Sequence, residues 1–248
     1  MKKLFSFIAI LWFVSGFTRA QTMNVTYKTV TDNNASMSYT ISATYPQVDF
    51  GPEALMGLRG IAGDINNSLD TTVNGIIRSF VKNITGIPEK TIKGKGSSLN
   101  ITSRGWVSNG AIFSTELTTF NNVAGMAHPM TTTTTLNYNM NGAGPLPLSR
   151  LFKKDSEYLN YISTTAIQQL TAKADKEGYT NINDMILSGA AADSKNFSEW
   201  TVRNDSLNII FNPYQTAPYV FGIQTVSIPL SNMLNMIDPK GPLAFMYR

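Results

Sequence analysis

The sequence predicts an α+β protein in which two small antiparallel sheet-plus-helix units pack together. Three observations support this class. Segments with a period of two are typical of strands, and they recur in pairs joined by short turns. Two longer segments repeat their apolar residues every three or four positions, as amphipathic helices do. Strands, a helix and more strands occur twice without regular βαβ alternation, which favours antiparallel sheets.

The first strand and the first helix lie in the N-terminal part of the chain. Residues 36–45 alternate apolar and hydroxyl side chains, which predicts a half-buried strand. From Leu55 to Phe80 the apolar residues recur at spacings of three and four, so a long helix follows. Several glycines weaken the start of this pattern. We therefore expect the firm part of the helix to run from Asp64 to Lys82.

A hairpin and a further strand follow the first helix. Residues 97–107 and 111–121 have strand character and are joined through Asn109 and Gly110, a pair that tolerates the positive φ of a tight turn. Residues 130–140 alternate again. The run of threonines within them is interpreted as strand sequence, because a branched Cβ packs well in pleated structure.

The second unit begins with a helix and continues with strands. The helix is expected from Ser156, with Asp155 or Ser156 as its cap and Gly178 at or just beyond its end. Its predicted buried stripe consists of Leu159, Ile162, Ala166, Leu170 and Ala174.

Two strands and a closing segment follow this helix. Residues 198–203 and 207–211 pair through a turn at Asn204. Residues 223–228 form the last predicted strand, and a short helix is expected near residues 230–236.

Between the last two strands lies the most informative segment of the chain, FNPYQTAPYVFGIQTVSIP. Pro213 and Pro218 each fix φ and remove a backbone donor, so the residues between them cannot pair as a strand and must stand off the sheet. Gly222 then allows the chain to turn back.

Tyr214 and Tyr219 lie on this stiff loop. A tyrosine on a low-entropy backbone offers a contact surface that is apolar along its ring and polar at its tip. One interpretation leaves at least one ring exposed as a contact point. The other packs both rings over the second helix as part of the core.

The first residues have the features of a secretory signal peptide. Two lysines precede an apolar run at residues 4–14, and Thr18 with Ala20 forms the small-x-small pattern that signal peptidase recognises. The run is about half of the ~20 residues that a membrane-spanning helix needs. We expect residues 1–20 to be a signal peptide cleaved after Ala20 and the protein to be exported, periplasmic or secreted. The alternative is an uncleaved N-terminal anchor.

The composition of the predicted mature chain excludes several classes of protein. The signal peptide holds three of the 20 basic residues and no acidic residue, which leaves 17 basic against 16 acidic side chains. Such a chain lacks the field that concentrates nucleic acid, so no nucleic-acid partner is expected. The chain has no cysteine, which excludes a lipid-attached lipoprotein and leaves hydrophobic burial to hold the fold. We expect no membrane span in the mature chain.

The sequence lacks most of the residues that catalytic and metal sites need. His128 is the only histidine and there is no cysteine, so neither a zinc site nor a cysteine nucleophile can be assembled, and no cofactor is expected. A serine triad would need His128, yet no G-x-S-x-G element accompanies it. His128 is interpreted as bonding to backbone at a strand entry, with direct ligand contact as the alternative. Glu116 and Glu199 could each face a groove, but the sequence does not pair them.

Three ordered motifs carry a family resemblance. They are AHP at residues 127–129, PLPLSRLF at residues 145–152 and Y-x-x-A-P-Y-x-x-G at residues 214–222, followed by NMIDP near the end. Together they resemble the C-terminal domain shared by the anti-sigma factor RsiV and PdaC-type peptidoglycan deacetylases. The region before residue 121 resembles the smaller domain that usually precedes it.

The resemblance implies binding at the cell envelope. In RsiV this region recognises lysozyme, and in PdaC a separate catalytic domain performs the deacetylation. The implied organisation is a signal peptide at 1–20, an N-terminal PdaC-like α+β domain at 21–120, an RsiV-like C-terminal α+β domain at 121–240 and a tail at 241–248.

The expected function is that of an exported, non-enzymatic envelope binding module. Its partner is expected to be a lysozyme-type muramidase or a cell-wall glycan, held through Tyr214, Pro218, Tyr219, His128 and Pro129. Two alternatives stay open at this point. One is a cell-wall glycan hydrolase with a carboxylate pair that the sequence does not reveal, and the other is a purely structural envelope protein.

Overall fold

The structure of the protein is a computed structural model. It describes residues 23–88, 96–142, 144–179 and 181–247. The predicted signal peptide, residues 1–20, lies outside the described residues.

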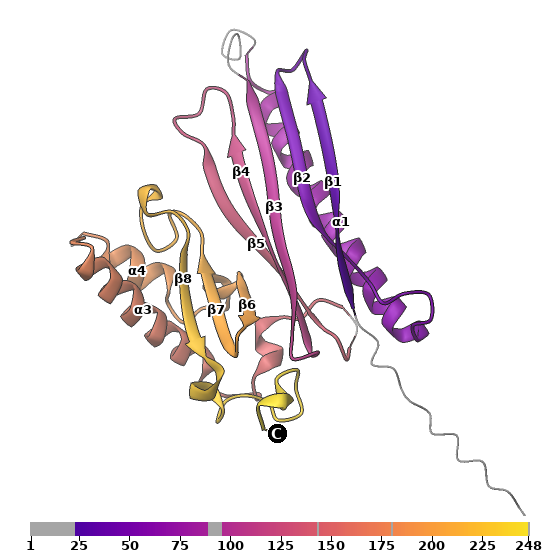
Figure 1. Cartoon of the computed structure of the whole chain (residues 1–248). Coiled ribbons are helices and arrows are strands. Elements are labelled where there is room, and N and C mark those ends of the chain that lie inside the picture. Colours follow the sequence, from indigo (N-terminus) through magenta and orange to yellow (C-terminus); the bar gives the residue numbers. More distant parts are fainter. Residues whose placement is uncertain (1–22, 89–95, 143, 180, 248) are drawn as a thin grey trace, which may run out of the picture.

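The first unit is a five-stranded sheet covered on one face by a long helix (Figure 1). The strands follow one another in sequence order: β1 (Asn24–Asn34), β2 (Tyr39–Asp49), β3 (Ser97–Ser108), β4 (Ile112–Asn122) and β5 (Met130–Asn139). The helix α1 (Met56–Thr85) connects β2 to β3. This arrangement confirms the predicted α+β class.

One strand pair departs from the expected antiparallel pairing. β2 and β3 are parallel, whereas the other pairs of this sheet are antiparallel. The reason is the helix between them. It carries the chain back to the end of the sheet at which β2 began, so β3 runs in the same direction as β2. The Asn109–Gly110 hairpin is confirmed, with φ of 48° and 66° at the two residues.

The helix α1 is regular from its first turn, where the glycines led us to expect a weak start. It starts at Met56, and its glycines do not interrupt it. Its buried residues Ile65, Leu69, Val73 and Phe80 pack against the sheet. Packing of an amphipathic face contributes more to helix stability than propensity does, which explains the difference.

The edge strand β1 was not predicted, and its burial pattern gives the reason. Most of its residues are exposed, so no alternation of apolar and polar side chains marks it. Its position depends on the ladder that it forms with β2 along its whole length. Long-range pairing of this kind leaves no local signal.

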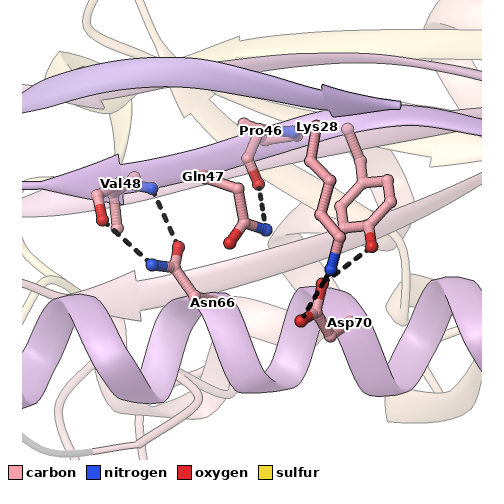
Figure 2. Close-up of polar contacts among 7 residues, drawn as sticks. Lys28, Pro46, Gln47, Val48, Asn66 and Asp70 are labelled. Atoms are coloured by element: carbon pink, nitrogen blue, oxygen red, sulfur yellow. Dashed lines mark hydrogen bonds and ion pairs between the residues drawn. The ribbon is translucent and has the colours of Figure 1, made fainter. Parts of the chain in front are cut away.

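Side chains of α1 bind the part of β2 that does not pair with β3, as Figure 2 shows. β2 pairs with β3 only as far as Ala43, which leaves Val48 without a backbone partner on that side. The Asn66 side chain replaces the missing strand: its Oδ1 accepts from Val48 N at 2.8 Å and its Nδ2 donates to Val48 O at 3.0 Å. One turn further along, Asp70 accepts from Lys28 and from the Tyr45 hydroxyl.

The second unit is a three-stranded antiparallel sheet with helices on one side (Figure 1). It consists of β6 (Trp200–Arg203), β7 (Ser206–Phe211), β8 (Gln224–Pro229), α3 (Tyr158–Lys176) and α4 (Asn183–Gly189). Single-turn 3-10 helices complete the fold: η1 (Leu148–Leu151), η2 (Ser194–Phe197), η3 (Tyr219–Phe221), η4 (Leu230–Met233) and η5 (Ala244–Tyr247). The predicted stripe of α3 lies against the core, as Ile162, Ala166, Leu170 and Ala174 are buried.

In the second unit the cap of α3 was predicted wrongly, one short helix was predicted correctly and another was missed. Neither Asp155 nor Ser156 caps α3, because the Ser156 hydroxyl donates to the Lys153 carbonyl and Asp155 takes a left-handed conformation. The short helix expected near residues 230–236 is confirmed as the 3-10 helix η4. α4 was missed, since a helix of seven residues is too short for a periodic pattern.

Buried hydrogen bonds join the two units where β6 crosses β4 and β5. The Asn137 side chain accepts from Ser114 Oγ and donates to the Trp200 carbonyl, each at 2.7 Å. The Ser108 hydroxyl donates to the Val202 carbonyl at 2.6 Å. These bonds fix the three-stranded sheet against the open face of the larger one.

The boundary between the two units differs from the predicted division. β5 pairs with β4 along its length, so the first sheet extends to residue 139, beyond the predicted division at residue 120. Leu243, in the segment predicted as a tail, is fully buried, and the Tyr247 hydroxyl donates to the Ile237 carbonyl at 2.9 Å. The division into independent domains stays a prediction.

Within the described ranges, no helix has the length and apolar character needed to cross a membrane.

Candidate functional site

The structure brings together side chains that the sequence places on two separate loops. His128 and Pro129 lie on the loop between β4 and β5, and Tyr214, Pro218 and Tyr219 lie on the loop between β7 and β8. The His128 ring stacks on the Tyr219 ring with centroids 3.9 Å apart and 26° between the planes. His128 Nε2 lies 3.1 Å from the Tyr214 hydroxyl. We call His128, Tyr214 and Tyr219 the aromatic tip.

The hydrogen bonds of His128 determine its tautomer. Its Nδ1 lies 3.0 Å from the Pro129 carbonyl oxygen, which can only accept, so Nδ1 carries the hydrogen. Nε2 of the neutral ring is then the acceptor for the Tyr214 hydroxyl. The predicted backbone bond of this histidine is confirmed. It also orients Tyr214, a contact that sequence spacing does not reveal.

The tyrosines of the aromatic tip do not pack over the second helix. Tyr214 keeps 51% of its surface exposed, and Tyr219 is half-buried beneath His128. The neighbouring Val220 is 82% exposed. Instead, Phe221 makes the contact near the end of α3, where its ring meets that of Tyr179 at 4.2 Å. The core-packing interpretation of Tyr214 and Tyr219 is therefore wrong.

The backbone of the aromatic loop, residues 212–223, is strained at the tip. Tyr214 has φ of 70°, in the left-handed region that non-glycine residues rarely occupy, and its N–H donates to the Ala217 carbonyl at 2.9 Å. Gly222 has φ of 63°, which confirms its predicted role in turning the chain. Strain of this kind persists only where the surroundings hold it, and it often marks functional sites.

Two amide side chains hold the aromatic loop in place. Asn212 acts as a strand partner for β5: its Oδ1 accepts from Thr133 N at 2.7 Å and its Nδ2 donates to Thr133 O at 2.9 Å. Gln215 Nε2 donates to the carbonyls of Asn196 and Gly189, at 2.8 and 3.1 Å. The loop is thus tied to both units. Its tyrosines are presented on a rigid support, which reduces the entropy cost of binding.

A groove runs between the open face of the first sheet and the second sheet. Its volume is about 460 Å³. One wall carries Thr118 and Thr133, and the other carries Asn208, Thr225 and Ser227. Thr133 is also the residue that Asn212 binds, so the groove begins where the aromatic loop is anchored.

The two glutamates that the sequence offers as groove candidates, Glu116 and Glu199, are both already bound. Glu116 lines the groove and forms an ion pair with Arg104 at 2.5 Å. Glu199 Oε2 accepts from the Thr135 N–H at 2.5 Å and from its hydroxyl at 3.0 Å. Burial raises the pKa of the Glu199 carboxyl above its ordinary value of 4.5, and the two bonds from Thr135 oppose the shift only in part.

The raised pKa of Glu199 predicts how stability depends on pH. The folded state binds a proton more tightly than the unfolded state, so Glu199 stabilises the fold most below its unfolded pKa of 4.5. That contribution is lost as the pH rises through the folded pKa. Glu199→Gln keeps an acceptor for Thr135 and stays neutral. The stability gained by this variant, measured by urea unfolding at a series of pH values, is expected to grow over that window. A difference that is constant with pH would contradict the assignment.

Among the described residues, no group of three or more histidine, cysteine, aspartate or glutamate side chains could hold a metal ion.

Comparison with known proteins places the second unit in a defined class. Residues 149–231 match the family model described as "Protein of unknown function (DUF3298)". The matched stretch covers η1, α3, α4 and the three-stranded sheet with the aromatic loop. The second unit of this α+β protein is thus similar to the domain that this family model describes.

A curated relative supports the same assignment. The chain is 29% identical over 117 residues to the peptidoglycan-N-acetylmuramic acid deacetylase PdaC of Bacillus subtilis (strain 168). The match covers 47% of this chain and only 24% of that enzyme, so the chain spans about a quarter of the length of this relative. Together with the family model, it confirms the resemblance to PdaC-like domains predicted from the motifs.

Two crystal structures share the whole two-unit fold. A DUF3298-family protein from Bacteroides fragilis has a TM-score of 0.58 at 18% identity and covers 90% of this chain and 96% of its own. Another from Pseudomonas aeruginosa PAO1 has a TM-score of 0.54 at 13% identity and covers 89% and 96%. At these identities the likeness concerns the fold alone.

The structure brings His128, Tyr214 and Tyr219 of the five candidate residues together, but the sequence did not indicate what holds them. Asn212 and Gln215 carry no signal beyond the common preference of amides for loops. The partner of His128 lies 86 positions away. Only an alignment of residues that vary together, or the fold itself, could have linked the two loops.

Proposed function

We propose that this protein is an exported, non-enzymatic module of the cell envelope that binds a protein partner of the lysozyme-type muramidase class through the aromatic tip. The observation that carries the proposal is the half-exposed Tyr214, oriented by His128 on an anchored loop. Tyrosines of this kind are enriched among the residues that dominate binding energy in protein interfaces. The exposed Val220 extends the apolar part of the same surface.

The cell-wall context supports this proposal. The PdaC relative acts on peptidoglycan, and the stretch matched to this chain is about a quarter of that enzyme. In a deacetylase, a wall-binding domain would keep the enzyme at its substrate. In the present protein, the same kind of domain would bind a protein that acts on the wall. The predicted signal peptide, residues 1–20, is the reason for proposing export.

The test is titration of a lysozyme-type muramidase into the chain from residue 21 onward, followed by calorimetry. Tyr214→Ala is expected to weaken binding by about thirtyfold, the effect of removing one dominant interface residue. Tyr27→Ala is the matched control, because Tyr27 is 52% exposed on β1, far from the loop. It should leave the affinity unchanged. Absence of a complex at high micromolar concentration, or equal loss in both variants, would exclude this partner.

A cell-wall glycan is the second candidate, and the groove favours it. Hydroxyl and amide side chains line both walls, and such groups exchange hydrogen bonds with sugar hydroxyls. In the same titration, a chitin oligosaccharide that binds without the muramidase would favour the glycan. Thr118→Val, on the groove wall, should then weaken it while Tyr214→Ala does not.

A binding role is favoured over hydrolysis because Glu116 and Glu199, the two candidate carboxylates, are both occupied. Glycosidases need one carboxyl group as an acid and a second as base or nucleophile across the scissile bond. Glu116 is held by Arg104 and Glu199 by Thr135. Turnover of peptidoglycan fragments that disappears in Glu116→Gln would instead establish the hydrolase.

A further inference from the structure

A large basic pocket lies at the end opposite the aromatic loop. Its volume is about 760 Å³, within the range of ligand sites. Figure 1 shows the C-terminal segment, which forms one wall, at the far end of the three-stranded sheet from the loop between β7 and β8. We call this cavity the basic pocket. Its lining includes four cationic side chains, Arg150, Lys153, Lys154 and Lys240.

The charge of this pocket stands out against the rest of the chain. The predicted mature chain is nearly neutral, yet the pocket gathers four cations against two acids, Asp155 and Asp238. The three ion pairs found among the described residues involve Lys28, Arg104 and Lys195, and none of them lines the pocket. The cations are therefore not neutralised by pairing within the fold.

Three of the four cations also have free side-chain nitrogen atoms. Within the described residues, the side-chain nitrogens of Arg150, Lys154 and Lys240 have no hydrogen-bond acceptor, while Lys153 Nζ donates to the Asn235 carbonyl at 2.7 Å. The guanidinium group of Arg150 can donate two parallel hydrogen bonds, and each lysine ammonium group adds a single charged donor. Such donors bind oxyanions.

The backbone that carries these cations is fixed. Lys153 N donates to the Met236 carbonyl at 2.8 Å, and Asp238 N donates to the Leu151 carbonyl at 3.1 Å. A Cβ at Gly241 would lie 3.3 Å from the Arg150 carbonyl, so the two segments touch closely. The four cationic side chains are exposed to solvent and line one pocket, so their combined field attracts an anion.

One acid in the pocket is already partly engaged. Asp238 Oδ1 accepts from the Lys240 backbone N–H at 2.9 Å. This bond fixes the turn that carries Lys240 and leaves the Lys240 ammonium group free to meet a ligand.

We propose that the basic pocket binds a small ligand with at least two negatively charged oxygen groups, phosphoryl or carboxylate. Arg150 and Lys240, from the two walls, are its main contacts. The stacked rings of Phe152 and Tyr158, with centroids 4.4 Å apart, form part of the lining and leave room for an organic body next to the charges. This site is independent of the aromatic tip and of the protein partner proposed for it.

Calorimetric titration of the chain from residue 21 onward with pyrophosphate and, separately, with citrate tests the proposal. Saturable binding of at least one anion is expected, weakening as salt increases because the charges are screened. Binding of pyrophosphate alone identifies a phosphoryl ligand, and binding of citrate alone identifies a carboxylate ligand. N,N′-diacetylchitobiose, an uncharged sugar, should not compete for the pocket.

Substitution locates the site. Arg150→Gln and Lys240→Gln should each weaken binding about tenfold or more, as expected for loss of one hydrogen bond to a charged group. The control for the double variant Arg150→Gln with Lys240→Gln is Arg78→Gln with Lys82→Gln, which removes the same two charges from the exposed face of α1 and should change the affinity little. The proposal is overturned if neither anion binds, or if the α1 pair weakens binding as much as the pocket pair does. Muramidase binding by the same variants should stay unchanged, which separates this test from that of the proposed function.

Discussion

Replacing Gly189 with alanine is expected to destabilise the protein by about 3 kcal/mol, because the new methyl group has no space. Its Cβ would lie 1.9 Å from the Gln215 carbonyl oxygen and 2.7 Å from the Gln215 carbonyl carbon. Both are backbone atoms of the aromatic loop, so the loop must move away from the end of α4. Urea unfolding followed by tryptophan fluorescence measures the loss.

The same displacement should weaken partner binding at the aromatic tip. Gln215 holds the Gly189 carbonyl and the Asn196 carbonyl, and moving it releases Tyr214 from its anchored position. The expected result is a loss of muramidase affinity that accompanies the loss of stability.

A second glycine provides the control for this prediction. Gly75 lies within α1, and a Cβ there would meet nothing within 4 Å. Gly75→Ala is therefore expected to stabilise the protein by roughly 0.5–1 kcal/mol through helix propensity. Equal changes in the two variants would show that the close contact at Gly189 does not limit the fold.

The second large effect is expected at the junction of the two units. Asn137→Ala removes the group that accepts from Ser114 Oγ and donates to the Trp200 carbonyl, and it leaves a buried carbonyl without a partner. Each unsatisfied buried group costs about 1–3 kcal/mol. We expect a total loss of about 3 kcal/mol, measured by urea unfolding.

Asn33→Ala is the control for the junction. Asn33 is exposed on the edge strand β1, and its removal should change stability by less than about 0.5 kcal/mol. If Asn137→Ala proves equally mild, water or a local shift satisfies the Trp200 carbonyl, and the junction is held by apolar contacts instead.

Local chemistry made several parts of this fold predictable. The Asn109–Gly110 hairpin follows from two residues that tolerate positive φ. The break between β7 and β8 follows from Pro213 and Pro218, which cannot join a ladder. The buried stripe of α3 follows from its helical period. In each case the determining interaction lies within a few residues of the pattern.

Other parts depended on partners far away in the chain. The parallel pairing of β2 with β3, the exposed strand β1 and the exposure of Tyr214 carried no local signal. The contact of His128 with Tyr214 and Tyr219 joins two loops, and each loop is placed by a different sheet. The basic pocket joins Arg150 to Lys240 in the same way.

The sequence by itself determined the α+β class and the loop between two prolines that carries Tyr214 and Tyr219. It also determined which chemistry is possible, because the chain has no cysteine and a single histidine. Those properties follow from residue type and from period, which short-range sterics and side-chain chemistry determine. Only the tertiary structure decides which side chains face solvent, which loops meet and where uncompensated charge gathers. These depend on burial and on hydrogen bonds between residues distant in the chain, and such interactions exist only once the two sheets are packed.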